Sequence, residues 1–170
     1  MRPILLAALI VPAALTAQEG IPFSQHGAVL QVMGLDTITI SYNRPVARGR
    51  RLFGGLVAWD HIWHPGADSA TTITFSKDLI VEGQPLAAGS YTLWTIPDSV
   101  QWTVIFSKAL HVFHTPPPSS AFDVLRVKVK PEQGPHMEVL AFYFPVVGPD
   151  SATLRLHWGT TIVPIRLHAR

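Results

Sequence analysis

The stretch from Ser151 to His168, SATLRLHWGTTIVPIRLH, decides the fold class. Apolar and polar residues alternate along it with a period of two, which is typical of β-strands that bury one face. We predict two strands joined by a turn at Gly159 and Thr160. If Trp158 pairs with Thr161, the next cross-strand partners are all apolar and share one face: Leu156 with Val163, Leu154 with Ile165, and Ala152 with Leu167. The polar residues then face the other way: Arg155, His157, Arg166 and His168.

The same alternation is present in other segments, which are separated by Gly, Pro, Asn and Asp rather than by capped helices. Residues that we expect on inward faces are Ile38, Ile40 and Tyr42, then Trp102, Val104 and Phe106, then Leu125, Val127 and Val129. Arg126, Lys128 and Lys130 form an outward cationic stripe, which we interpret as a solvated face rather than an anion-binding surface. Pro164 lacks an N–H, so we expect the last strand at a sheet edge. The proline-rich segment 115–120 marks a long connection. Roughly ten short strands of this kind predict an all-β fold, an antiparallel β-sandwich.

The bulk composition supports one folded domain. The chain has 170 residues, of which 48% are hydrophobic and only 14% are charged, so it must bury an apolar core. A formal net charge of +2 is too small an excess to indicate nucleic-acid binding. The chain contains no cysteine, which excludes disulfides and thiol nucleophiles. We therefore predict a single domain over residues 18–170.

The N-terminal segment, residues 1–17, has the pattern of a signal peptide: a positive charge at Arg2, an apolar run, and a small residue at Ala17. The apolar run is shorter than the roughly 20 residues that span a bilayer as a helix, and Pro12 interrupts it. We predict export to the periplasm, the cell surface or the medium. An uncleaved anchor is the alternative, and only in that case would the protein contact a membrane.

Several short motifs lie in a fixed order between Ser24 and the C-terminus: Arg44-Pro45, Gly49-Arg50, Phe53-Gly54-Gly55-Leu56-Val57, Ala88-Gly89-Ser90-Tyr91 and Trp102-Thr103-Val104-Ile105-Phe106. In this order they resemble a bacterial family known as domain of unknown function 2911. The resemblance implies an exported, mostly β protein, with no agreed reaction or ligand. The family usually has Arg, Asn and Glu at the positions that His64, Asp68 and Ser69 occupy here.

Histidines and carboxylates suggest a metal site as one hypothesis. His61, His64 and Asp68 lie close in sequence, and His111 and His114 form a second pair; imidazole and carboxylate are suitable ligands for a divalent transition metal. On an extended strand, however, residues three apart point to opposite faces. We therefore favour polar loop or surface histidines and predict no cofactor. A Ser69–His64–Asp68 triad is disfavoured because the side chains of near neighbours diverge, so we assign no catalytic residue.

The segment between Arg44 and Ser69 is the one region dense in Arg, His, Trp and Asp. Its arginines could bind an anion or could brace loop carbonyls, and we favour the second role. Trp59 and Trp63 are the loop tryptophans that could form a sugar platform, whereas Trp102 and Trp158 are expected in the core.

Our leading hypothesis is an exported, non-enzymatic β-sandwich that binds a partner protein or a small ligand through this region. The residues predicted to bind are Arg44, Arg50, Trp63, His64 and Asp68. Two alternatives stay open: a metal-dependent enzyme using His61, His64 and Asp68, with His111 or His114, and an extracytoplasmic accessory subunit of a membrane complex. The sequence does not predict an oligomeric state.

Overall fold

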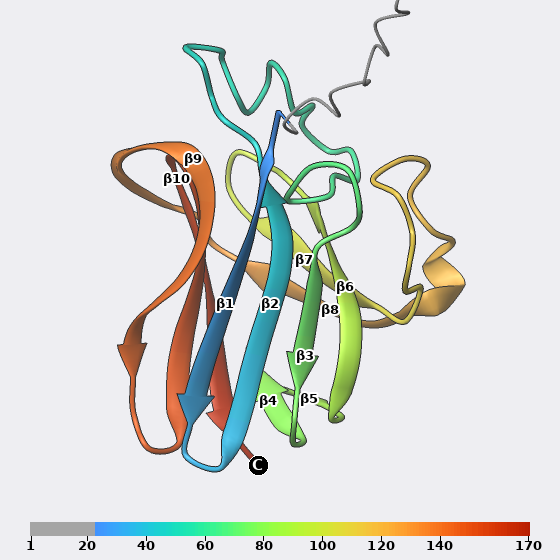
Figure 1. Ribbon diagram of the computed structural model, residues 1–170, viewed down its shortest axis with the longest axis vertical. Coiled ribbons are helices and arrows are strands. Elements are labelled where there is room, and N and C mark those ends of the chain that lie inside the picture. The colour runs from blue at the N-terminus through green and yellow to red at the C-terminus, as the bar shows by residue number, and fades with distance from the viewer. Residues whose placement is uncertain (1–22) are drawn as a thin grey trace, which may run out of the picture.

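The computed structural model describes residues 23–170, which form ten strands in two antiparallel sheets packed face to face (Figure 1). The predicted all-β sandwich is thereby confirmed. The predicted signal segment, residues 1–17, lies outside the described residues. Among residues 23–170, no helix is long and apolar enough to cross a membrane.

The larger sheet has six strands in the order β1-β2-β3-β6-β7-β8. Its strands are β1 (Gln25–Met33), β2 (Asp36–Arg44), β3 (Thr72–Phe75), β6 (Gly89–Ile96), β7 (Trp102–Ser107) and β8 (Asp123–Val129). The predicted inward faces of β2, β7 and β8 are confirmed, because Ile38, Val104 and Val127 are all buried with their alternating neighbours. Arg126 and Lys128 are exposed on the opposite face of β8, as expected.

The smaller sheet has four strands in the order β5-β4-β10-β9. Its strands are β4 (Leu79–Val81), β5 (Gln84–Leu86), β9 (Glu132–Val147) and β10 (Ser151–Ala169). A short 3-10 helix, η1 (Ser120–Phe122), precedes β8. The strand count matches the expectation of roughly ten, but β9 and β10 are long rather than short.

Residues 151–168, which were expected to form two strands, belong to the single strand β10. The predicted hairpin at Gly159 and Thr160 is therefore wrong. β10 pairs with β9 from Ala152 to Ile162 and with β4 from Leu167 to Ala169. Gly159 has φ 59°, and the register shifts on both sides of it. It is therefore a bulge, which adds a residue and exchanges the faces to which alternate residues point. Even-numbered residues before Gly159 and odd-numbered residues after it are therefore buried in the same core. A hairpin with its turn at Gly159 and Thr160 would bury the same residues, so the sequence pattern alone does not distinguish the two structures.

The predicted edge position of Pro164 is also wrong, because β10 lies inside the four-stranded sheet. Pro164 follows the last residue paired with β9, Ile162, and precedes the first residue paired with β4, Leu167. Its missing N–H therefore interrupts neither ladder of paired residues.

The main core lies between the two sheets. Trp102 and Trp158 belong to it, as predicted, and Leu154, Val163 and Phe106 pack in the same cluster. A second, smaller cluster lies on the outer face of the six-stranded sheet, where the connection 108–119 folds over Trp94 and Ile105. The proline-rich segment 115–120 lies in the long connection between β7 and β8, as predicted, and its last residue begins η1.

Candidate functional site

A long crossover, residues 45–71, joins β2 to β3 and closes one end of the sandwich. Its first residues follow the edge of β9, with Ala47 N–H donating to the Glu138 carbonyl and Leu140 N–H donating to that of Pro45. Further on, Trp63 exchanges two main-chain hydrogen bonds with Thr95, at the end of β6. These bonds hold the crossover at both ends, so the side chains between them have fixed positions over the end of the core (Figure 1).

Five aromatic rings meet where the crossover covers the core. Phe53 lies at the centre, with its ring centroid 4.8 Å from Trp102, 5.7 Å from Trp63, 6.0 Å from Trp59 and 6.3 Å from Trp158. Trp63 stacks on Trp158 at 6.0 Å and an interplanar angle of 8°. Edge-to-face and stacked pairs of this kind add roughly 0.5–1.5 kcal/mol each beyond the area that they bury. The cluster is therefore a rigid wall.

A cleft of about 420 Å³ opens on this wall, between the crossover and the bulged part of β9 and β10. Phe53, Trp59 and Trp158 supply its aromatic side. The polar residues around it are Arg50, Ser99, Gln133, His136, Thr160 and Thr161. The volume lies in the range of small-ligand pockets, and an apolar surface with a few polar groups is typical of them.

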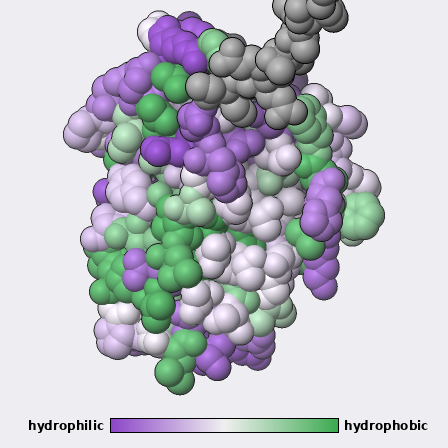
Figure 2. All heavy atoms as spheres, viewed as in Figure 1, coloured by the Kyte–Doolittle hydropathy of each residue, from purple (hydrophilic) through white to green (hydrophobic). Residues whose placement is uncertain are grey.

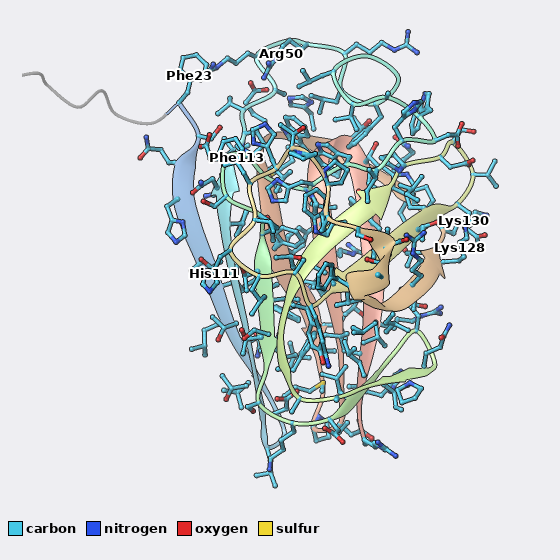
Figure 3. The ribbon with its side chains drawn as sticks, turned by 90° about the vertical axis from the view of Figure 1, so that its right-hand side faces the viewer. Phe23, Arg50, His111, Phe113, Lys128 and Lys130 are labelled. Carbon is cyan, nitrogen blue, oxygen red and sulfur yellow. The ribbon has the colours of Figure 1, made fainter. Side chains whose placement is uncertain are left out.

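The guanidinium of Arg50 is fixed at this cleft. Its Nε donates to the Ala47 carbonyl at 2.9 Å, and one terminal nitrogen donates to the Val46 carbonyl at 2.6 Å. Both acceptors are neutral, so the positive charge stays unneutralised, and no Asp or Glu lines the cleft. Figure 3 shows Arg50 among the loops at the crossover end of the molecule.

His136 lies on the opposite side of the cleft and is oriented by an acid. Its Nε2 is 2.8 Å from Glu138 Oε2, and Glu138 also accepts from the Arg48 N–H. The hydrogen bond with His136, and then the one with Arg48, lower the pKa of the Glu138 carboxyl. The Glu138 carboxylate therefore stays ionised near neutral pH and accepts hydrogen bonds from both sides.

Gly159 shapes the wall of the cleft for two reasons. Its positive φ is one that residues with a Cβ adopt at a cost. A Cβ at this position would also lie 2.8 Å from Leu52 Cδ1, which is too close for an unstrained contact. A larger residue at position 159 would therefore adopt a strained φ and force the Leu52 side chain to move.

The structure does not gather the five predicted binding residues at one place. Arg50 lines the cleft, and Trp63 lies behind the wall, stacked on Trp158. Arg44 lies elsewhere and donates from Nε to the Leu140 carbonyl at 3.1 Å, which braces β2 against β9.

His64 is buried on the other side of the crossover, where only 2% of its surface is exposed. Its Nε2 accepts the main-chain N–H of Thr71, so the proton of the neutral ring is on Nδ1. Nδ1 is buried and has no hydrogen-bond partner among the described residues. Burial, and then the nearby His114, lower the pKa of His64 to about 4. His64 is therefore neutral near pH 7.

The metal candidates do not form a binding group in residues 23–170, where no three His, Asp or Glu side chains meet in a way that could hold a metal ion. His61 Nδ1 is 2.7 Å from the Trp59 carbonyl. Asp68 accepts from the His114 N–H through its main-chain oxygen, not its carboxylate. His111 lies on the outer face of the six-stranded sheet, at a separate pocket that Phe113 also lines (Figure 3).

Comparison with protein families gives one match, which covers residues 24–167. The matching family is described as Protein of unknown function (DUF2911). The chain belongs to this family. Comparison with curated proteins and comparison with solved structures each give no match. Membership in DUF2911 assigns no activity to the chain.

Within this DUF2911 member, position 64 differs chemically from the Arg that the resemblance leads one to expect. His64 accepts the Thr71 N–H, whereas a guanidinium has only donors and cannot accept it. Ser69 forms a main-chain bridge with Phe113, and Asp68 has φ 59°. The segment therefore serves here to join the crossover to the connection 108–119.

Sequence reasoning missed several residues of the cleft: Phe53, Gln133, His136, Thr160 and Thr161. Thr160 was expected in a turn and Thr161 at the start of the strand after it, and Gln133 and His136 are far from the crossover in sequence. Only the long pairing of β9 with β10 brings them beneath it. Trp59 was identified as a loop aromatic, and it does line the cleft.

Proposed function

We propose that this protein is an exported, non-enzymatic binding protein that holds a small ring-shaped ligand in the cleft between the crossover and the β9–β10 bulge. The observation that carries the proposal is the aromatic wall of Phe53, Trp59 and Trp158 facing the fixed, unneutralised Arg50. Trp158 is buried at the base of this wall, so a flat ligand ring would stack on the partly exposed Phe53 or Trp59, and polar side chains around the cleft would set the orientation of the ligand.

The charge of the cleft favours a ligand with an anionic substituent. Arg50 is cationic, His136 is paired with Glu138 outside the cleft, and the cleft has no acidic side chain. A carboxylate on the ligand would lie near the guanidinium, and hydroxyl groups would face Thr160 and Gln133. A sugar acid combines these features, so we infer a sugar acid or a compound of the same shape and charge.

Among the described residues of the cleft, no nucleophile is hydrogen-bonded to a base, and this supports binding rather than catalysis. Ser99, Thr160 and Thr161 carry hydroxyls at the cleft, but no described hydrogen bond joins any of them to His136. An activated nucleophile needs a base within hydrogen-bond reach.

The test is a titration with glucuronate and galacturonate, each matched to its neutral sugar, glucose or galactose, and followed by tryptophan fluorescence and calorimetry. We expect saturable binding, tighter for the acids than for the neutral sugars and weakened by salt. Trp59→Ala and Arg50→Ala are expected to reduce the affinity about tenfold or more. Leu56→Ala and Arg51→Ala, at exposed crossover positions that do not line the cleft, are the matched controls.

Failure of all four sugars to bind saturably would refute the sugar-acid assignment, and unchanged affinity in Trp59→Ala and Arg50→Ala would refute the cleft. The proposed export is tested separately by the intact mass of the protein recovered from outside the cytoplasm, where a species that begins at Met1 would exclude cleavage.

A further inference from the structure

The edges of the two sheets differ in how well they are protected against pairing with another chain. An edge strand presents main-chain N–H and C=O groups without partners, and proteins protect such edges with charges, prolines, short strands or covering segments. The six-stranded sheet ends in β1 and β8, and the four-stranded sheet ends in β5 and β9.

Three of these edge strands carry such protection. β8 carries the charged side chains of Arg126 and Lys128. β5 has only three residues, and one of them is Pro85. β9 contains Pro135 and Pro145, and the start of the crossover covers its middle through main-chain hydrogen bonds.

β1 carries none of these features. Its nine residues, QHGAVLQVM, include no Asp, Glu, Lys, Arg or Pro. β1 pairs with β2 in continuous register, without a bulge, and no other strand among residues 23–170 pairs with it. It is therefore a long, regular and uncharged edge strand, which is the kind that adds a strand from another chain.

The main-chain groups that β1 presents can be assigned from its hairpin with β2. The loop has two residues, Gly34 and Leu35, and such a loop closes on a hydrogen-bonded pair, here Met33 with Asp36. Alternate residues therefore direct their N–H and C=O groups away from β2: Ala28, Leu30 and Val32. In agreement with this, the Val32 carbonyl accepts a hydrogen bond from the Gln31 side chain at 2.8 Å rather than from β2.

The side chains beside this edge are apolar and exposed. Leu30 is 65% exposed and Val32 is 50% exposed, both on the outer face of β1. Leu35 at the hairpin loop and Val146 and Val147 at the end of β9 are exposed as well. Figure 2 shows apolar side chains gathered on the lower left of this face, where the lower halves of β1 and β9 lie in Figure 1.

We propose that β1 pairs antiparallel with β1 of a second copy, so that the two six-stranded sheets join into one sheet across a two-fold axis. A second copy of this chain fits the edge, because β1 can pair antiparallel with an identical β1 strand in a register that brings apolar side chains together. With the axis at Leu30, each Leu30 lies opposite its counterpart, and Ala28 lies opposite Val32 of the other copy. The side chains that meet in these pairs are all apolar, and β1 carries no Asp, Glu, Lys or Arg that could place like charges together.

A two-fold axis perpendicular to the sheet keeps both four-stranded sheets on one side of the joined sheet. The paired residues Ala28, Leu30 and Val32 would exchange about six main-chain hydrogen bonds with the second copy. A strand of nine residues is about 30 Å long, so the contact buries on the order of 1,000 Å² in total. This is the lower end of specific interfaces, and it predicts a micromolar rather than a nanomolar dimer.

Sedimentation velocity of the full chain, from about 5 to about 200 µM, tests the proposal. The wild-type protein is expected to pass from monomer to dimer within this range. Leu30→Lys places a charge at the centre of the edge, at an already exposed position, and is expected to weaken association at least about tenfold. Val124→Lys is the matched control, because Val124 is an exposed apolar residue in the opposite edge strand; it is expected to associate like the wild type.

The register is tested by cross-linking, since the chain has no cysteine of its own. In a hydrogen-bonded antiparallel pair the Cα atoms lie about 5.5 Å apart, within the range that a disulfide spans. Leu30→Cys is therefore expected to form a disulfide-linked dimer under mild oxidation. Ala28→Cys alone is expected to cross-link poorly, but to form a mixed dimer with Val32→Cys. Val124→Cys is the control.

A wild-type protein that stays monomeric up to the highest concentration overturns the proposal, and the edge would then be free for a strand of another protein. A dimer that Leu30→Lys leaves intact, or that Leu30→Cys does not link, places the contact elsewhere and overturns it equally. Circular dichroism of each variant excludes unfolding as the cause of a lost dimer.

Discussion

Protonation of His64 is expected to make the stability of this protein depend on pH between about 4 and 6.5. The ring is buried, its Nε2 accepts the Thr71 N–H, and its pKa is lowered to about 4. In the unfolded chain the same imidazole titrates near 6.5. The unfolded state therefore binds a proton at a higher pH than the folded state, so acidification favours unfolding.

The magnitude follows from the two pKa values. A difference of about 2.5 units, at about 1.4 kcal/mol per unit, gives a loss of about 3 kcal/mol when the pH falls through the whole window. About 2 kcal/mol of this is lost by pH 5, and the contribution of His64 is fully present again above about pH 7. Carboxyl groups with lowered pKa, such as that of Glu138, lose their contributions at lower pH. The interval from pH 7 to pH 5 therefore separates the contribution of His64 from those of the carboxyl groups.

The assay is urea unfolding at several pH values, followed by tryptophan fluorescence. His64→Gln stays neutral throughout, and its amide oxygen can accept the Thr71 N–H. The difference in unfolding free energy between pH 7 and pH 5 is expected to be about 2 kcal/mol smaller in His64→Gln than in the wild type. His168→Gln removes an exposed histidine and is the control. Equal pH dependence in the wild type and His64→Gln would show that the buried, neutral His64 is the wrong description.

Four further substitutions test other parts of the structure, each by unfolding free energy. Gly159→Ala is expected to cost about 2 kcal/mol or more, because it adds a contact with Leu52 to an unfavourable φ; Gly83→Ala, at φ 81° with open space around it, should cost only the backbone strain. Asp36→Ala is expected to cost about 3 kcal/mol, because Asp36 Oδ1 accepts three hydrogen bonds from Ser76 and Lys77, whereas Asp36→Asn should cost less. Trp158→Phe should cost about 1 kcal/mol less than Trp94→Phe, because the buried Nε1 of Trp158 has no acceptor in the described chain while that of Trp94 donates to Thr92. His64→Arg alone should destabilise the protein strongly, and adding Asp68→Asn and Ser69→Glu, which restores the family pattern, should recover part of the loss; no recovery would show that the three positions are not coupled.

Local alternation predicted the parts of the fold that depend on local sequence. β2 and β8 each have one apolar face, and a single register places that face on the core, so Ile38, Tyr42 and Val127 could be assigned without the structure. The pairing of strands distant in sequence, such as β4 with β10, has no comparable local signal. The crossover region was identified by its composition, but which of its side chains meet depends on those long-range pairings.

His64 illustrates why the binding residues were harder to predict than the strands. Its residue type suggested a ligand, yet burial and the Thr71 N–H give it a structural role. Arg44 and Arg50 have the same donor groups, and the Nε of each donates a hydrogen bond to a main-chain carbonyl. Only their positions distinguish them, because Arg50 lies at the cleft and Arg44 lies between β2 and β9. Residue type therefore identifies candidate binding residues, but the pairing of distant strands determines which of them lie at the cleft.

The bulge at Gly159 connects the mistaken hairpin prediction with the proposed site. A hairpin at this glycine would return the chain along the first half of β10, and β4 would lose its partner at Leu167. The bulge instead lets the strand continue, and it places Thr160 and Thr161 at the cleft, next to the buried wall of Trp158. Leu52 packs against the strand here, at a point where a Cβ would lie 2.8 Å from its Cδ1. The same glycine therefore keeps both halves of β10 in the core and seats the crossover whose Arg50 and Trp59 complete the cleft.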